Sequence, residues 1–233
     1  MPVWQELRSE LQPRGLEIVT VALDVDADAA RPHIEAAQPT HPSLIDQAHV
    51  VDELFGIVNV PNGVWIDEDG MIVRPAEPAH PGRNPETESF RNIDASTLPP
   101  EIAEMLTEAR KIRTEPELYL SMVRDWVARG SESRFVLEPD EVVRRSHARN
   151  DDEAGAAAHF ELGQHLHRAG DHDAAVAHWR EAHRLAPGNW TYKRNAWNFE
   201  DPGRQGPSEQ YDSSWFADVK AIGAENYYPP LVP

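Results

Sequence analysis

The feature that most constrains the fold is a set of small and large residues at fixed positions between residues 156 and 187. Apolar residues three or four positions apart on either side of Gly170 predict two helices, and Gly170 favours a turn between them. The small Gly163 and Ala175 allow the two helices to approach closely, and Trp179 fills the space between them. The full set is Leu162, Gly163, Leu166, Gly170, Ala175, Trp179, Ala182 and Pro187.

These spacings resemble one tetratricopeptide repeat, a unit of about 34 residues built from two antiparallel helices. The resemblance covers residues 156–189. Because a single repeat cannot bury its own faces, other helices must pack against it. We expect these neighbours to be the helices predicted between residues 102 and 147 and a further helix at 189–199, whose aromatic residues cover the open end.

The resemblance also implies a partner-binding surface. Phe160, Gln164 and His167 fall on the helix face that usually lines the concave groove of such repeats. They are therefore implied contacts for a protein or peptide partner. Ordinary packing of this face against the preceding helices is the alternative.

The first 75 residues are predicted to form an α/β layer. The run at 16–23 is apolar and rich in β-branched residues, which is typical of a strand buried on both faces of a parallel sheet. The turn Asp67–Gly70 lies between two apolar runs, which predicts a hairpin. The expected helices lie at 3–12, between 24 and 37, and at 50–55, and the expected strands at 16–23, 43–46, 64–66 and 71–73.

Residues 1–75 resemble a thioredoxin-like domain of the TlpA/ResA type. The resemblance rests on Pro2-x-Trp4-x-x-Leu7, on the strand Ile18–Leu23 followed by Asp24, on Leu54-Phe55-Gly56-Ile57, and on the run VNVPNGVWIDEDG at 58–70. In such domains the proline at the Pro61 position is cis, and the residue before it offers its backbone to an extended substrate. Val60 and Pro61 are therefore implied substrate-binding residues, with Trp4 beside them. An ordinary turn before a strand, and a Trp4 buried in the core, are the alternatives.

The sequence departs from this family at the active site. Members carry a first strand and then a Cys-x-x-Cys motif at the start of the first helix, whereas this chain has no cysteine and its matching helix begins at Met1. The resemblance places the strand and the nucleophiles just upstream of Met1. No catalytic residue is expected in the chain as given, and thus no turnover.

Three explanations remain open. The chain is truncated or mis-started, in one version because a selenocysteine codon was read as a stop. ResA-like proteins with a Trp-Ala-x-x-Sec-Gly-x-x-Pro motif and a tetratricopeptide C-terminal part are similar to this chain, and the similarity extends through residues 190–194 (WTYKR). Alternatively, the domain is naturally redox-dead and retained for binding. The third explanation is coincidence.

The predicted organisation is an α/β thioredoxin-like domain, lacking its first strand and redox motif, followed by an all-α tetratricopeptide-like domain. The first spans 1–75, and a Pro-rich linker or surface excursion follows at 76–100. The helical domain spans 101–200, and an irregular tail rich in proline and aromatic residues completes the chain at 201–233.

Charge and composition limit the partners. A net charge of -18 opposes binding to nucleic acid or to an anionic membrane surface. No window approaches the roughly 18 apolar residues of a transmembrane helix, and the start MPVWQE has no basic n-region and no apolar h-region of a signal peptide. We therefore expect no membrane insertion and, by default, a cytoplasmic location, although a missing N-terminus would change this.

No metal or cofactor is expected. Six histidines lie between His159 and His183, but none forms a pair within one helix at the spacing of three or four that a zinc site needs. Asp24, Asp26 and Asp28 imitate the start of a calcium loop. The sixth position is Ala29, where such a loop needs glycine.

Two functions follow from these patterns. By resemblance, the complete protein is a thiol- or selenol-disulfide oxidoreductase or a peroxide reductase, with a disulfide or peroxide as substrate. The alternative is a non-catalytic interaction module that uses the tetratricopeptide-like helices.

Overall fold

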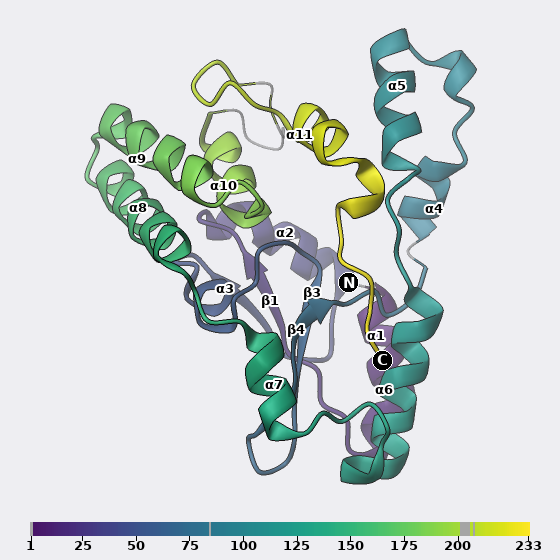
Figure 1. Cartoon of the computed structure of the whole chain (residues 1–233). Helices are drawn as coiled ribbons and strands as arrows, with labels where there is room; N and C mark the ends of the chain where they lie inside the picture. Colours follow the sequence, from purple (N-terminus) through teal and green to yellow (C-terminus); the bar gives the residue numbers. More distant parts are fainter. Residues whose placement is uncertain (1, 84, 201–205, 207) are drawn as a thin grey trace.

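The computed structural model describes residues 2–83, 85–200, 206 and 208–233. An α/β layer occupies one end of the molecule, and the helices of the second half lie beside and above it (Figure 1). The C-terminal segment returns from the helices to the α/β layer and ends close to α6. Part of the predicted tail, residues 201–205 and 207, lies outside the described residues.

The first half follows the predicted order of elements. The helices are α1 (Pro2–Leu11), α2 (Ala27–Ala37) and α3 (Val50–Phe55), and the strands are β1 (Thr20–Leu23), β2 (Ser43–Asp46), β3 (Asn62–Ile66) and β4 (Ile72–Pro78). The predicted hairpin is confirmed, because β3 and β4 pair antiparallel. The carboxylate of Asp67 stabilises its turn by accepting from the backbone N–H groups of Asp69 at 3.1 Å and Met71 at 2.8 Å.

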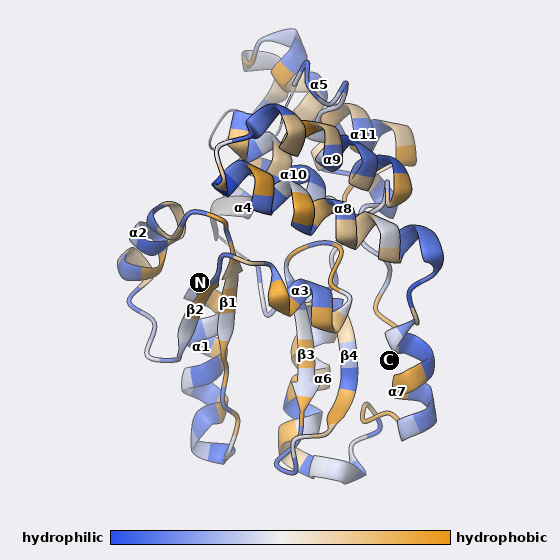
Figure 2. Cartoon of the chain, turned by 90° about the vertical axis from the view of Figure 1, so that its left-hand side faces the viewer, coloured by the Kyte–Doolittle hydropathy of each residue, from blue (hydrophilic) through white to orange (hydrophobic). Residues whose placement is uncertain are grey.

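The strands form two separate sheets. β1 and β2 pair in parallel, with Thr20 opposite Ser43 and Leu23 opposite Asp46. Among the described strands, no ladder joins this pair to β3 and β4. Figure 2 shows the four strands in the order β2, β1, β3, β4, with a space between β1 and β3. The structure therefore establishes a small α/β layer, and two separate sheets do not make a thioredoxin fold.

The prediction of a strand buried on both faces at 16–23 is wrong. Only Thr20–Leu23 is a strand, and it is half-buried. Ile18 belongs to the core, whereas Val19 is 55% exposed and Leu44 is 53% exposed. Val21 lies opposite Leu44 in the parallel ladder, and Val19 shares its face because strand side chains alternate. Ile18 packs with Leu7 and Leu11 of α1, whereas Val19 stays exposed, so the apolar run does not reach full burial.

The core of the α/β layer is built with a helix from the second half. α6 (Pro116–Arg129) buries Tyr119, Met122 and Val123 against α1 and the β3–β4 hairpin. The indole of Trp65 stacks on Trp126 with 4.9 Å between ring centroids. The other buried members of this cluster are Leu7, Leu11, Ile18, Val73, Ala79, Phe135 and Leu231.

The remaining elements are helical. The helices are α4 (Pro85–Arg91), α5 (Pro100–Ala109), α7 (Pro139–Ser146), α8 (Asp151–Arg168), α9 (His172–Leu185), α10 (Trp190–Glu200) and α11 (Trp215–Ile222), with 3-10 turns at Gln12–Arg14, Ala95–Thr97, Gly130–Glu132 and Ala224–Asn226. Residues 76–100 include the end of β4, α4 and a 3-10 turn. The prediction of an irregular tail is wrong in part, because α11 and the 3-10 turn Ala224–Asn226 lie in it. The domain boundaries at 75, 100 and 200 stay predictions, and the cluster described above contains residues from both sides of them.

The predicted helix pair is confirmed. α8 and α9 pack along their length as antiparallel helices, with Ala175 and Trp179 fully buried. α8 begins at a capping box, in which the Asn150 side chain accepts from Glu153 N and the Glu153 carboxylate accepts from Asn150 N, both at 2.9 Å. α10 packs against α9, as the predicted covering helix.

The prediction that the helices between 102 and 147 cover the repeat is wrong for α6 and α7. Ile112, which follows α5, does pack against the core that contains the repeat. The apolar stripe of α6 packs against the β3–β4 hairpin, as described above. α7 packs against β4, where Val142 is buried and Leu137 N donates to Val73 O at 3.1 Å. The apolar side chains of α6 and α7 therefore pack against the α/β layer and not against the repeat.

Replacing Gly163 by alanine should destabilise the protein. A Cβ atom there would lie 2.4 Å from Nε1 of the fully buried Trp179. Helix propensity alone favours alanine by about 1 kcal/mol, but overpacking a core costs about 1–3 kcal/mol or more. We expect a net loss of about 1–2 kcal/mol in urea unfolding. In the matched control Gly188→Ala the new Cβ meets open space, so its stability should stay within about 0.5 kcal/mol. Equal stabilities of the two variants would contradict this packing.

Candidate functional site

The repeat meets the α/β layer where α10 begins. The first amides of a helix have no partner inside it, and here Trp190 N and Thr191 N donate to Val58 O at 2.7 and 3.3 Å. The Asn189 side chain supports the same turn by accepting from the N–H groups of Thr191 at 3.1 Å and Tyr192 at 3.2 Å. The loop after α3 is thereby fixed to the first turn of α10.

A buried polar chain joins α3 to the middle of α10. His49 Nδ1 lies 2.9 Å from Asp52 Oδ2, and His49 Nε2 lies 2.7 Å from Asn195 Nδ2. The amide nitrogen of Asn195 is a donor, so His49 Nε2 accepts and Nδ1–H donates to the carboxylate. The ring also packs edge-to-face on Phe160 of α8 at 5.2 Å. One histidine thus contacts α3, α8 and α10.

Glu53 makes a third connection at the same junction. Its carboxylate accepts from the hydroxyl of Tyr192 and forms an ion pair with Arg149. Burial, and then the hydrogen bond to Glu53, raise the pKa of Tyr192. The phenol therefore remains a proton donor to the carboxylate across the physiological range.

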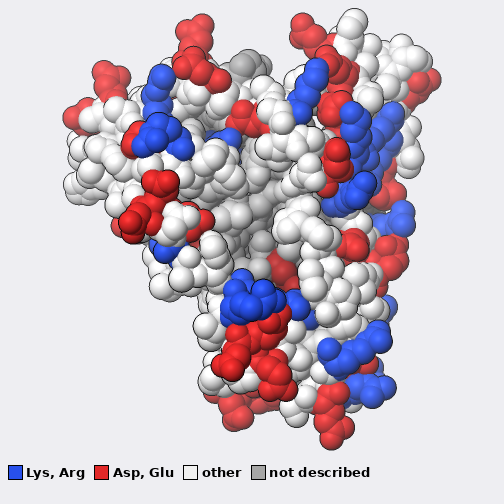
Figure 3. Space-filling model, viewed as in Figure 1, with Lys and Arg blue, Asp and Glu red and all other residues white. Residues whose placement is uncertain are grey.

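A cleft of about 410 Å³ lies beside this junction. Its lining is apolar at Phe55, Ile57 and Val58, and charged groups of both signs surround it. Figure 3 shows the surface hollowed between the repeat and α7. The other lining residues are Asp52, Glu53, Gly56, Pro75, Ala76, Arg145, Ser146, His147, Arg149, Asn150, Asp152, Glu153, Leu185, Ala186, Pro187, Gly188, Asn189 and Tyr192.

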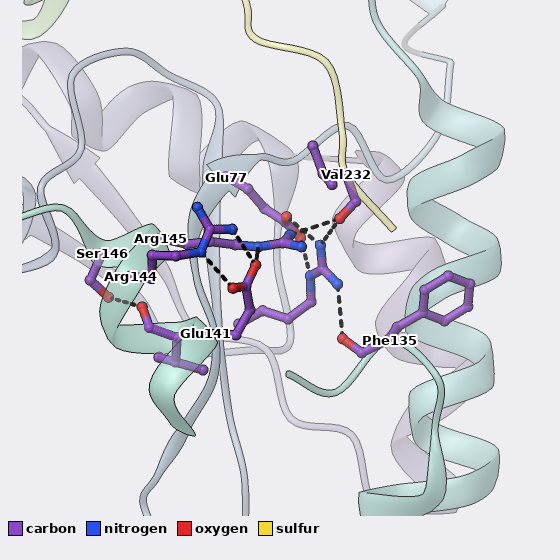
Figure 4. Close-up of polar contacts among 9 residues, drawn as sticks. Glu77, Phe135, Glu141, Arg144, Arg145, Ser146 and Val232 are labelled. Carbon is purple, nitrogen blue, oxygen red and sulfur yellow. Dashed lines mark hydrogen bonds and ion pairs between the residues drawn. The ribbon is translucent and has the colours of Figure 1, made fainter. Parts of the chain in front are cut away.

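One wall of the cleft is held by a network around the C-terminal segment (Figure 4). The fully buried Arg74 is paired with Glu77 at 2.7 Å and donates to Phe135 O at 2.8 Å. Val232 O accepts from Arg74 at 2.6 Å and from Arg145 at 2.9 Å. A buried guanidinium is tolerated only when its charge and its donors are satisfied, so these contacts fix α7 and the tail relative to β4.

The predicted substrate-binding residues lie under the same tail. The Val60–Pro61 peptide bond is cis, as the family resemblance implies. Val60 N donates to the Asn59 side chain at 2.9 Å, and Val60 O accepts from the hydroxyl of Tyr228 at 2.7 Å. The backbone groups that an extended substrate would use are therefore engaged within the chain.

The side chains of Trp4, His80 and Tyr228 around this point are half-buried. Tyr228 packs edge-to-face on His80 at 5.1 Å. Burial, and then the nearby Arg91, lower the pKa of His80 to about 4, so its ring is neutral at physiological pH. Trp4 packs edge-to-face on Tyr119 at 6.2 Å and joins the core of the α/β layer. Substrate binding by Val60, Pro61 and Trp4 stays a prediction.

The predicted partner-binding residues lie beneath α10. Phe160 is 1% exposed and stacks on Tyr192 at 4.2 Å, and Gln164 is 3% exposed. The half-buried His167 packs on Phe199 at 4.1 Å. α10 therefore occupies the groove that a peptide would fill, and partner binding by these residues stays a prediction.

The acidic and histidine clusters make local contacts. Asp24 and Asp26 accept from backbone amides at 3.1 and 2.9 Å, and Asp26 thereby caps α2. Across the described part of the chain, no group of three or more His, Cys, Asp or Glu side chains is placed to hold a metal ion. Over the same residues, no helix is long and apolar enough to cross a membrane.

Comparison with known proteins identifies one part of the chain. Residues 156–189 match the tetratricopeptide repeat. This match covers most of α8, all of α9 and the loop to α10, in agreement with the packing of the two helices. No curated protein and no solved structure matches the chain significantly. The tetratricopeptide repeat is therefore the recognised unit, and it points to a protein partner.

Sequence patterns alone did not identify the junction. His49 and Asp52 lie three residues apart, Asn195 lies 146 residues further along the chain than His49, and the three belong to no motif. One signal was present, because the family resemblance extends through residues 190–194, which form the first turns of α10. These residues contact the loop before Pro61, and local sequence spacing does not predict such a long-range contact.

Proposed function

We propose that this chain is a non-catalytic protein-interaction module. The observation that carries the proposal is the tetratricopeptide repeat at 156–189, folded as α8 and α9 and held on the α/β layer by α10. Such repeats occur as binding surfaces for protein segments. The chain also has no cysteine, so thiol chemistry on its own residues is excluded.

The cleft beside the repeat is the surface that supports this function best. The concave face is filled by α10, whereas the cleft is open and has apolar side chains at its centre, among them Val58, which is 48% exposed. Clefts with an apolar floor and a few polar groups are the usual form of binding sites.

The charges of the cleft limit the partner. Arg145 is paired with Glu141, and Arg149 with Glu53, within the chain. Asp152, also on the lining, adds negative charge to a chain whose net charge is -18. Complementarity then favours an extended partner segment that combines apolar side chains with Lys or Arg.

A photoreactive amino acid at Val58 tests this surface. Placed there in the source cells, it should crosslink a protein, and the same group at Val143 should not. Val143 is 74% exposed on α7 and is not part of the cleft lining, so it is a matched control. The crosslinked protein is then purified and titrated with the chain by calorimetry.

We expect Val58→Lys to weaken binding of that protein at least tenfold, because an ammonium would be buried against apolar side chains and would repel the basic residues of the partner. Val143→Lys should bind within twofold of the wild type. Circular dichroism controls for folding. Equal affinities of Val58→Lys and the wild type would contradict the proposal, as would crosslinking at Val143 alone.

The open sheet edges favour a second candidate, a thiol- or selenol-dependent oxidoreductase of the thioredoxin-like superfamily. β1 and β3 each have one edge without a described ladder partner, and exposed edges of this kind accept a further strand. One extended strand between them would pair with both and make a continuous sheet. The nucleophile would lie on the segment that brings this strand, and the substrate would be a disulfide or a peroxide.

The intact mass of the native protein from its source cells separates the candidates. The second candidate predicts a mass several kilodaltons above 26.2 kDa and an N-terminal peptide that contains Cys or Sec. It also predicts no dithiol-dependent reduction of insulin or peroxide by the chain as given. A native mass that matches residues 1–233, with or without the initiator Met, would contradict it.

A further inference from the structure

The ends of three helices meet at a pair of histidines. His167 in the last turn of α8 and His172 at the start of α9 place their Nδ1 atoms 2.9 Å apart. His172 Nε2 lies 3.0 Å from Glu200 Oε1 at the end of α10. The hydroxyl of Tyr211 donates to the same carboxylate oxygen at 3.4 Å. The contacts form a continuous polar chain across α8, α9 and α10.

The Nδ1···Nδ1 contact limits how many protons the pair can hold. A hydrogen bond between these atoms needs one Nδ1–H and one lone pair. In the neutral pair, His172 Nε2–H donates to Glu200, and His172 Nδ1 accepts from His167 Nδ1–H. One added proton is tolerated, because a single lone pair remains between the rings. Two imidazolium rings would place an N–H against an N–H, so the doubly protonated pair must separate.

The groups around the pair also affect the protonation of His167. Burial, followed by the neighbouring His172, lowers the pKa of His167, and Arg168 acts in the same direction. Glu200 opposes this shift, and Tyr211 contributes a neutral hydroxyl. The remaining contacts of His167 are apolar, to Phe199 at 4.1 Å and Trp179 at 5.8 Å between ring centroids. His167 is half-buried among these rings, and the side chain of His172 is 37% exposed.

We propose that His167 and His172 form a proton-sensitive latch, which ties the end of α10 to the turn between α8 and α9 and opens on acidification. Above the ordinary histidine pKa of about 6.5 the latch is closed. Below it, the open form binds one proton more than the closed form can hold. The equilibrium constant for opening therefore rises up to tenfold for each unit by which the pH falls. Opening exposes Trp179, Phe199 and His167 itself.

The latch operates without a partner. Use of the exposed face, which includes His167, to bind a protein rests on the proposed interaction function. Measurements on the purified chain alone test the latch, so its failure and the failure of the proposed function are distinguishable.

Hydrogen exchange followed by mass spectrometry measures the latch directly. We expect the amides of the α8–α9 turn and of the last turn of α10 to lose at least tenfold in protection factor between pH 7.5 and pH 5.5, after correction for intrinsic exchange rates. His172→Gln should abolish this pH dependence. Its side-chain amide donates to Glu200 and accepts from His167 as the neutral histidine does, but takes up no proton.

His165→Gln is the matched control, because His165 is an exposed histidine of the same helix. It should retain the wild-type pH dependence. Unchanged protection of the wild-type chain at the two pH values would overturn the proposal. So would a His172→Gln variant with the full wild-type dependence.

An NMR titration of the wild-type histidines gives a test that does not depend on the variant folding. The ring of His167 should be protonated only below the ordinary histidine pKa, because burial and the neighbouring His172 lower its pKa, and its N–H signals should change together with those of the α8–α9 turn. Protonation of both rings in one step near the ordinary histidine pKa would overturn the latch.

Discussion

The structure depends on the burial of α10 between the repeat and the α/β layer. One side of this helix covers α8 and α9, where Tyr192 stacks on Phe160 and Phe199 on Trp179. The other side binds the α/β layer through Val58 O and the His49–Asn195 contact. A single repeat leaves apolar surface open on both flanks, and α10 covers one of them with aromatic rings. The aromatic contacts stabilise the helix pair, and the polar contacts set its position.

Polar groups at such a junction define position because they are costly to leave unpaired. A buried donor or acceptor without a partner costs about 1–3 kcal/mol. His49 and Asn195 are both nearly inaccessible, so a displaced α10 would lose these hydrogen bonds in a place where water does not replace them. The same burial removes Phe160 and Gln164 from solvent. The groove normally used by a repeat of this type is thus occupied from within the chain, and the open cleft beside it is the surface that we propose for a partner.

Local patterns predicted the elements well and their packing less well. The spacing from Leu162 to Pro187 predicted α8 and α9 because small and large residues at these positions permit only a close antiparallel pair. The Asp67–Gly70 turn predicted the hairpin because its chemistry is local. The wrong predictions concern packing between residues that are far apart in the sequence. The stripe of α6 fits any apolar face, and the sequence alone does not say that Trp65 provides it. The run at 16–23 has the composition of a buried strand, but burial depends on what covers Val19. The buried contact between His49 and Asn195 likewise depends on a partner 146 residues away.

The central claim is that α10 makes the repeat and the α/β layer one cooperative unit. The most direct test is equilibrium urea unfolding followed by the indole NMR signals of Trp65, in the core of the α/β layer, and Trp179, in the core of the repeat. If the junction couples the two cores, both signals disappear with the same midpoint. Two clearly separated midpoints would show that the repeat folds independently of the layer, and would contradict the role assigned to α10.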